Sequence, residues 1–111
     1  MRQIRHPLVR RDVEEIFEHV LATTQGDLDA AERRLDDIDA LLAAIAANPT
    51  SGFRLEGPLG GWIVRHGGMG RMITVVFRPD VGMRILYIGM IAFGGRNWPV
   101  EAEERRGFDI G

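Results

Sequence analysis

Two apolar runs on either side of a short turn dominate the pattern of hydrophobic and polar positions in this 111-residue chain. They span residues 71–78 and 84–90 and are rich in β-branched and long aliphatic side chains. Between them, Pro79 presets φ for a turn, Asp80 can bond back to the backbone, and Gly82 tolerates a positive φ. The pattern predicts a β-hairpin.

Before this hairpin, apolar residues recur at spacings of three and four, which is the period of an amphipathic helix. The first stripe predicts a helix between Pro7 and Thr24. The second follows Asp27, which is a suitable N-cap, and continues to Ile45. Two helices joined by about four residues form an antiparallel helical hairpin. The stripes consist of Val9, Val13, Ile16, Phe17, Val20 and Leu21, and of Leu28, Ala31, Leu35, Ile38, Leu42 and Ile45.

The remaining segments predict shorter elements. Residues 62–66 form a strand, and the glycine-rich residues 67–70 form the turn that connects it to the hairpin. Residues 3–5 form an opening strand before Pro7. The expected fold class is therefore α+β: a helical hairpin packed on a twisted, mainly antiparallel sheet of three to four strands. Residues 1–98 form one domain, and residues 99–111 form a charged C-terminal tail, with a short helix over 100–106 as the alternative.

Both faces of the predicted sheet are apolar. Alternation places Ile73, Val75 and Phe77 on one face and Met72 and Val76 on the other. The helical hairpin covers only one face, so an apolar strip is expected to stay exposed on the other, as at many partner sites. The alternative is that the loop of residues 53–59 or the C-terminal tail covers it.

Composition excludes several kinds of chemistry. The chain has no cysteine, which rules out disulfides, a thiolate nucleophile and cysteine-based metal sites, and fits a reducing compartment. All fourteen basic residues are arginines, so there is no lysine for a general base or a Schiff base. No apolar run approaches the roughly 20 residues of a membrane-spanning helix. We expect a soluble, cytoplasmic protein.

Charge is unevenly distributed although the net charge is only -2. Residues 12–39 contain ten acids and two arginines, whereas residues 54–96 contain six arginines and two acids. The fold should thus combine an acidic helical layer with a basic sheet. Arginines of that sheet can bind phosphate bidentately or can pair with the helical acids.

Candidate catalytic groups are few. His6, His19 and His66 do not share a metal-ligand spacing, and Ser51 has no histidine nearby in sequence. The glycine-rich segment 67–70 is not followed by a helix, so it is a turn and not a phosphate-binding loop. The sequence predicts neither a metal nor a cofactor.

The order of elements and several short segments resemble the ParE branch of the RelE/ParE toxin superfamily of bacterial type II toxin-antitoxin systems. The resemblance covers residues 4–98. It is carried by a short strand ending at His-Pro, by DVEEIF in the first helix, by ANPxxG after the second, and by RMITVVFRPD, MRILYIGM and GGRNW.

The resemblance implies a small toxin that a cognate antitoxin keeps inactive by wrapping it with its C-terminal segment. Such a segment can bind as a helix in a groove or as an added strand, which would give the apolar strip a role. The expected antitoxin-binding residues are Trp62, Val64, Met72, Val76 and Met90.

Members of the superfamily act on different targets. RelE-like toxins cut messenger RNA on the ribosome, whereas ParE-like toxins poison DNA gyrase. This chain lacks lysine, has a pI near 5.9, and carries Met90 and Trp98 where RNA-cutting relatives commonly carry His and Tyr. We therefore expect a non-enzymatic gyrase inhibitor without sequence-specific DNA binding of its own. Its target contacts would be Arg71, Arg84, Arg96 and Trp98, because Arg and Trp dominate binding hot spots.

Two alternatives remain. The first is a ribosome-dependent endoribonuclease that uses Arg71, Arg96 and His66, since RNA cleavage needs an acid, a base and stabilisation of phosphate charge. The second is a degenerate, non-toxic member that still binds an antitoxin.

Overall fold

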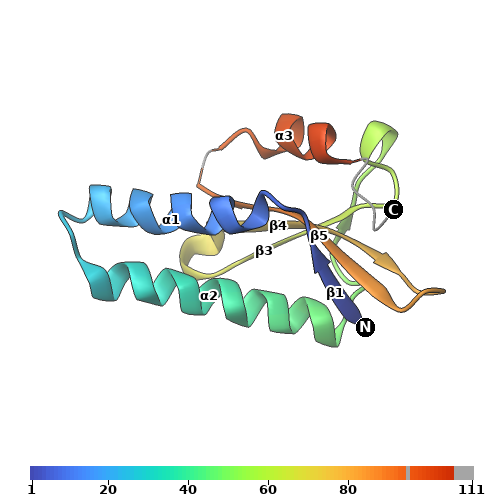
Figure 1. Cartoon of the computed structure of the whole chain (residues 1–111), viewed down its shortest axis with the longest axis horizontal. Coiled ribbons are helices and arrows are strands. Elements are labelled where there is room, and N and C mark those ends of the chain that lie inside the picture. The colour runs from blue at the N-terminus through green and yellow to red at the C-terminus, as the bar shows by residue number, and fades with distance from the viewer. Residues whose placement is uncertain (95, 107–111) are drawn as a thin grey trace.

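A computed structural model describes residues 1–94 and 96–106 of the chain (Figure 1). It consists of a helical hairpin, a mixed sheet and a short C-terminal helix. The helices are α1 (Val9–Thr23), α2 (Leu28–Ala47) and α3 (Trp98–Arg105), the strands are β1 (Arg2–Arg5), β2 (Phe53–Arg54), β3 (Ile63–Gly67), β4 (Ile73–Asp80) and β5 (Ile85–Phe93), and two 3-10 turns are η1 (Gly57–Leu59) and η2 (Met69–Arg71).

The helical hairpin is confirmed. Asp27 caps α2, because its side chain accepts a hydrogen bond from the backbone N–H of Ala30 at 3.1 Å. Gln25 and Gly26 both have positive φ and reverse the chain between the helices. The start and end of each helix lie close to those that the apolar stripes predict.

The sheet has five strands in the order β1-β5-β4-β3-β2, where three to four were expected. β1 pairs in parallel with β5, and the other neighbours are antiparallel. The strand that sequence reasoning missed is β2, whose two residues are too few to show a period of alternation.

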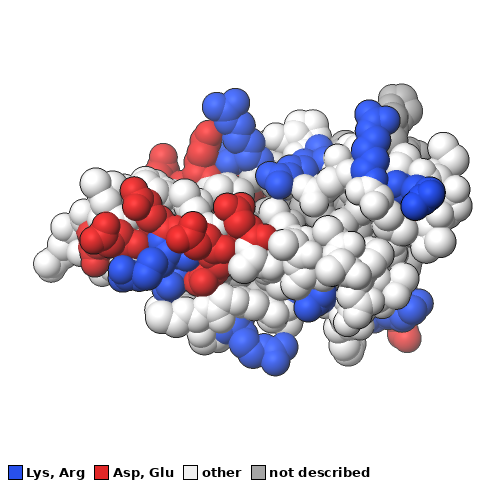
Figure 2. Space-filling model, turned by 90° about the horizontal axis from the view of Figure 1, so that it is seen from below, with Lys and Arg blue, Asp and Glu red and all other residues white. Residues whose placement is uncertain are grey.

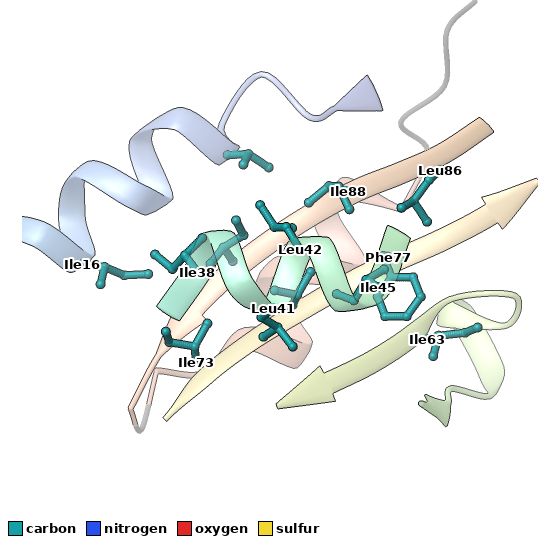
Figure 3. Close-up of a cluster of buried hydrophobic side chains, with 13 residues drawn as sticks. Ile16, Ile38, Leu41, Leu42, Ile45, Ile63, Ile73, Phe77, Leu86 and Ile88 are labelled. Atoms are coloured by element: carbon teal, nitrogen blue, oxygen red, sulfur yellow. The ribbon is translucent and has the colours of Figure 1, made fainter. Parts of the chain in front are cut away.

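The first face of the sheet packs against the helical hairpin. Figure 3 shows Leu42 and Ile45 of α2 between the helix and the strands that carry Phe77 and Ile88. This first-face core is composed of aliphatic and aromatic side chains: Val9, Ile16, Ile38, Leu41, Leu42, Ile45, Ile63, Ile73, Val75, Phe77, Leu86, Ile88 and Ile91.

The second face is also covered, so the expectation of an exposed apolar strip is wrong. α2 and α3 lie on opposite sides of the sheet (Figure 1), and Leu59 of η1 and Ala102 of α3 pack on the second face. Four of the five expected antitoxin-binding residues are buried in this second-face core, namely Trp62, Val64, Val76 and Met90. Only Met72, which is 40% exposed, remains accessible.

Met90 lies on the second face because of a β-bulge in β5. Val76 pairs with Met90 and Phe77 pairs with Ile88, which leaves Gly89 as an extra residue. Strict alternation along β5 would place Met90 on the same face as Ile88. The bulge needs glycine, since a Cβ at position 89 would lie 2.8 Å from the Trp62 ring.

The hairpin between β4 and β5 forms where expected, but its turn differs in detail. Asp80 accepts a hydrogen bond from the backbone N–H of Met83 at 3.0 Å, as its turn role predicts. The positive φ falls on Arg84, at 56°, and not on Gly82. Pro79 belongs to β4, at the level of Leu86.

The C-terminal segment, predicted as a charged tail with a short helix as the alternative, contains that helix. α3 covers residues 98–105 and buries Ala102 and Arg105 against the rest of the chain. The last five residues of the predicted tail, 107–111, lie outside the described residues.

Candidate functional site

The expected target-binding residues lie in three places. Arg71 ends η2, Arg84 lies in the turn between β4 and β5, and Arg96 and Trp98 flank the start of α3. Arg71 and Arg84 are exposed, whereas Trp98 is half-buried against the second-face core. These residues do not form one contiguous patch.

Arg71 and His66 line the same depression beside strands β2 and β3. We call it the β2–β3 depression; it has a volume of about 340 Å³ and is lined by Gly52, Phe53, Val64, Arg65, His66 and Arg71. It contains two arginines, a histidine and an aromatic ring, and none of its lining residues is acidic. The structure thus unites two of the three expected ribonuclease residues.

Local backbone geometry builds this depression. Gly52 has φ of 142°, and a Cβ there would lie 2.6 Å from Cγ2 of Ile63, so only glycine lets the chain approach β3 this closely. Phe53 follows, pairs with Val64 and is 73% exposed. On the other side, Arg71 has φ of 58°, a conformation that side chains other than glycine rarely adopt.

His66 is held in place by a neighbouring strand. Its Nδ1 lies 2.9 Å from Oγ1 of Thr74, a residue that is 5% exposed. Because Nδ1 is engaged, Nε2 is the ring nitrogen left for a ligand. The pair gives the depression one oriented donor or acceptor.

Arg96 occupies a different environment. It forms ion pairs with Glu101, with Glu15 at 3.3 Å and with Asp12 at 3.6 Å. Burial alone would lower the pKa of Arg96, but the hydrogen bond and charge of Glu101 and the charges of Asp12 and Glu15 raise it overall. Its charge is therefore compensated inside the chain. It does not line the β2–β3 depression.

Sequence reasoning missed a buried ion pair between α1 and α3. Asp12, which is 1% exposed, accepts two hydrogen bonds from the Arg105 guanidinium, at 2.7 and 2.9 Å. The signal was present: Asp12 follows Val9 by three residues and precedes Ile16 by four, so it lies on the apolar stripe of α1.

This pair also forms hydrogen bonds with backbone groups on the open edge of β5. β1 ends opposite Ile88, so the next backbone groups of β5 lack a strand partner on that side. The N–H of Ile91 donates to Asp12 at 3.0 Å, and Arg105 donates to the carbonyl of Gly89 at 3.1 Å. We call these groups the Asp12–Arg105 junction. Its role is structural, because it satisfies backbone groups that would otherwise be buried without partners.

Met72 lines a second depression, at the end of β5. It has a volume of about 480 Å³ and is lined by apolar groups and by the ion pair of Glu15 with Arg96. The ring of His19 contacts Phe93 edge-on at 5.7 Å between centroids. The lining residues are Glu15, Ile16, His19, Met72, Phe93, Gly94 and Arg96.

The charged side chains follow the expected layers in part. Figure 2 shows acidic groups gathered over the helical hairpin, with most of the arginines in that view toward the opposite end of the molecule. Among the described residues, no three His, Asp or Glu side chains are grouped closely enough to hold a metal ion. Within the same ranges, 1–94 and 96–106, no helix combines the length and apolar character needed to cross a membrane.

Comparison with solved structures finds chains with a similar fold. A chain in the crystal structure of the toxin-antitoxin complex RelBE2 from Mycobacterium tuberculosis aligns with a TM-score of 0.56 and 15% sequence identity. The match covers 83% of this chain and 95% of that one. No protein-family model matches the sequence, and none of the curated proteins matches it either. The likeness shows that this chain shares its α+β fold with that chain of the RelBE2 complex.

Proposed function

We propose that the chain is the toxin component of a type II toxin-antitoxin system and that a cognate antitoxin neutralises it. The observation that carries this proposal is the fold match, which spans nearly the whole of a chain from the RelBE2 toxin-antitoxin complex. The match also extends over most of this chain, so it concerns the complete α+β arrangement and not one motif.

The proposed target is DNA gyrase, and the proposed action is inhibition by binding. Two observations support a binding role over cleavage. Arg96 is occupied by Asp12, Glu15 and Glu101, and it lines a different depression from His66. Arg71 and Arg84 are the exposed members of the expected target-binding set. They are therefore the arginines that we expect to contact gyrase.

Endoribonuclease activity is the second candidate, and the β2–β3 depression favours it. His66, oriented by Thr74, would transfer protons, while Arg65 and Arg71 would stabilise charge on the scissile phosphate. This set differs from the one expected from sequence, because Arg65 takes the place of Arg96.

Two assays with the purified chain separate the candidates. Inhibition of gyrase supercoiling without cleavage of labelled message on translating ribosomes supports the first proposal. Cleavage of message contradicts it, and loss of that cleavage in His66→Gln would assign the acid–base role. Silence in both assays, with retained antitoxin binding, would indicate the degenerate, non-toxic member. Arg71→Ala should relieve toxicity while the circular dichroism spectrum stays unchanged, because Arg71 is exposed.

Antitoxin binding can be tested at Met72, the accessible member of the expected set. Met72→Asp would place a charge beside Ile16 and Phe93 and should weaken capture of the cognate antitoxin. Met83→Asp is the matched control, because Met83 is 69% exposed in the turn between β4 and β5. Equal capture by both variants would remove Met72 from the interface. The other four expected residues are buried in the second-face core, so they are not accessible in this conformation.

A further inference from the structure

We propose that Arg34 and Asp37 of α2 position Arg71, because they hold the η2 turn in one backbone conformation. The proposal rests on the proposed function in one respect, since Arg71 is a target contact only there. The hold of α2 on η2 belongs to the fold and does not depend on any target. Arg34 and Asp37 are then positioning residues, which act on a target through Arg71 and do not touch it.

The backbone of η2 sets the direction in which the Arg71 side chain is presented. Arg71 is exposed, and it forms no ion pair with any residue that the structure describes. Its φ of 58° is strained for a residue other than glycine and persists only where the surrounding structure enforces it. The Arg71 N–H donates to the carbonyl of Gly68 at 3.1 Å. Contacts between the turn and the rest of the chain therefore decide where Arg71 lies.

Asp37 connects α2 to the start of η2. Its Oδ2 accepts a hydrogen bond from the Met69 N–H at 3.3 Å and lies 3.0 Å from Nε of Arg34. The contact with Arg34 is ionic, since Nε is buried without an aligned hydrogen bond. A terminal nitrogen of Arg34 donates to the Met69 sulfur at 3.4 Å. Met69 is thus held by α2 both at its backbone and at its side chain.

This ion pair differs from the surface pairs of the helices. The side chains of Arg34 and Asp37 are 11% and 29% exposed, whereas those of Arg10 and Glu14 on α1 are 90% and 58% exposed. An exposed pair at helical spacing contributes little to stability. Loss of one partner costs more when the pair is covered, because the remaining charge has less water around it. The Arg34–Asp37 pair is therefore a contact between α2 and η2 as well as a contact within α2.

The glycine-rich segment 67–70 permits the close approach of η2 to α2. A Cβ at Gly67 would lie 3.0 Å from Cδ1 of Leu41, and a Cβ at Gly68 would lie 3.2 Å from Cβ of Asp37. Leu41 follows Asp37 by four residues, so the two side chains are neighbours on the same face of the helix. Besides forming the turn, these two glycines thus let it lie directly against α2.

The first test is amide hydrogen exchange of the full-length chain, measured by NMR, which needs no target. In Asp37→Ala, the amides of Met69 and Arg71 should exchange about tenfold faster than in the wild-type chain, because a hydrogen bond to a carboxylate is lost. Asp36→Ala is the matched control, since Asp36 is an exposed acid of the same helix. Asp37→Asn keeps an oxygen acceptor and should have a smaller effect. It provides the measurement if urea denaturation shows that Asp37→Ala is not folded.

The second test connects this hold to target binding. Dissociation constants for purified DNA gyrase are measured for the wild-type chain, Asp37→Ala, Arg71→Ala and the double variant. We expect Asp37→Ala to weaken binding by about tenfold in the wild-type background and to have little effect in the Arg71→Ala background, since the two residues act through one contact. A role in folding alone would weaken binding equally in both backgrounds.

Three outcomes would overturn the proposal. The first is unchanged exchange at Met69 and Arg71 in folded Asp37→Ala, and the second is an equal effect of Asp36→Ala. The third is an equal loss of gyrase binding in both backgrounds, because Asp37 would then not act through Arg71. A wild-type chain that does not bind gyrase would contradict the proposed function, whereas faster exchange in Asp37→Ala would still support the hold of α2 on η2. The two failures are therefore distinguishable.

Discussion

The two faces of the sheet are closed in different ways. On the first face, α1 and α2 bury a continuous apolar core in which every member is aliphatic or aromatic. On the second face, the cover is the η1 loop and the eight-residue helix α3, and the helix is held by the Asp12–Arg105 junction as well as by apolar contact. The cover of the first face is thus held by buried apolar area, and the cover of the second face is held also by a specific pair of charges.

This difference has an energetic consequence. Apolar burial is non-directional and roughly proportional to area, so it is lost in small steps when side chains are trimmed. A buried ion pair behaves otherwise, because removal of one partner leaves the other charge buried and uncompensated. The second face should therefore be the one at which a single substitution has the larger effect.

The largest effect is expected for Asp12→Ala. It leaves the Arg105 guanidinium buried without its carboxylate and removes the acceptor of the Ile91 N–H. We expect the free energy of unfolding to fall by about 3–5 kcal/mol, measured by urea denaturation.

Glu14→Ala is the control for that substitution, because Glu14 pairs with Arg10 at 3.3 Å on the exposed side of the same helix. Its cost should stay near 0.3–0.5 kcal/mol, roughly the value of a surface pair. If the two variants lose the same stability, the junction does not hold α3. The double variant Asp12→Leu/Arg105→Met should recover most of the loss, because it leaves no buried charge.

The contrast between the faces also explains what could be predicted from the sequence. The first face follows from periodicity: the stripes of α1 and α2 and the alternation of β4 each carry enough residues to reveal their period. The cover of the second face does not show a comparable pattern. β2 has two residues, α3 is largely charged, and the bulge at Gly89 shifts Met90 to the other face without any interruption of the apolar run.

The candidate site was predictable only in part. His66 and Arg71 were expected to act together, and both line the β2–β3 depression. Phe53 was missed as a site residue, because β2 was not expected and its pairing with β3 is what brings Phe53 beside them. Arg65 was considered as a phosphate-binding arginine of the sheet but was not included in the expected site. Arg96 was included in the expected site although its charge is compensated inside the chain. Its ion pair with Glu101 depends on the packing of α3, which is a tertiary feature that the sequence does not reveal.

Gly89→Ala tests the second face through shape instead of charge. The added Cβ would lie 2.8 Å from the Trp62 ring, so the ring or the bulge must shift. We expect a loss of about 1–3 kcal/mol, with a change in tryptophan fluorescence. Gly82→Ala is the control, since its Cβ would meet nothing closer than 3.7 Å and Gly82 does not have a positive φ. A neutral Gly89→Ala would show that the cover over Trp62 is loosely packed.

Ile45→Val tests the first face. Ile45 is completely buried among aliphatic neighbours, and the substitution removes one methylene without adding a polar group. We expect a loss of about 0.5–1.5 kcal/mol in urea, less than for Asp12→Ala. Leu28→Val, at a position of the same helix that is 57% exposed, should cost less than about 0.5 kcal/mol. An Ile45→Val loss as large as that of Asp12→Ala would contradict the proposed difference between the faces.

The smallest effect is expected from the titration of His6, which lies beside the Asp12–Arg105 junction. Burial lowers the pKa of His6 below 6.5, the charge of Arg105 lowers it further, and the charge of Asp12 opposes both. Protonation would also cost the hydrogen bond that Nδ1 accepts from the Leu8 N–H at 3.1 Å. Because the unfolded chain binds this proton more readily, the contribution to stability is complete above about pH 6.5 and is lost as pH falls through the lowered pKa.

His6→Gln removes this titration, so the stability of the wild-type chain relative to the variant should decrease on going from about pH 7.5 to about pH 5. Urea midpoints of the two proteins, measured across that range, provide the comparison. A constant difference between them would show that His6 does not sense the junction. If the wild-type chain instead became more stable relative to His6→Gln as pH falls, the sign would be reversed. The charge of Asp12 would then outweigh burial and the charge of Arg105 at His6.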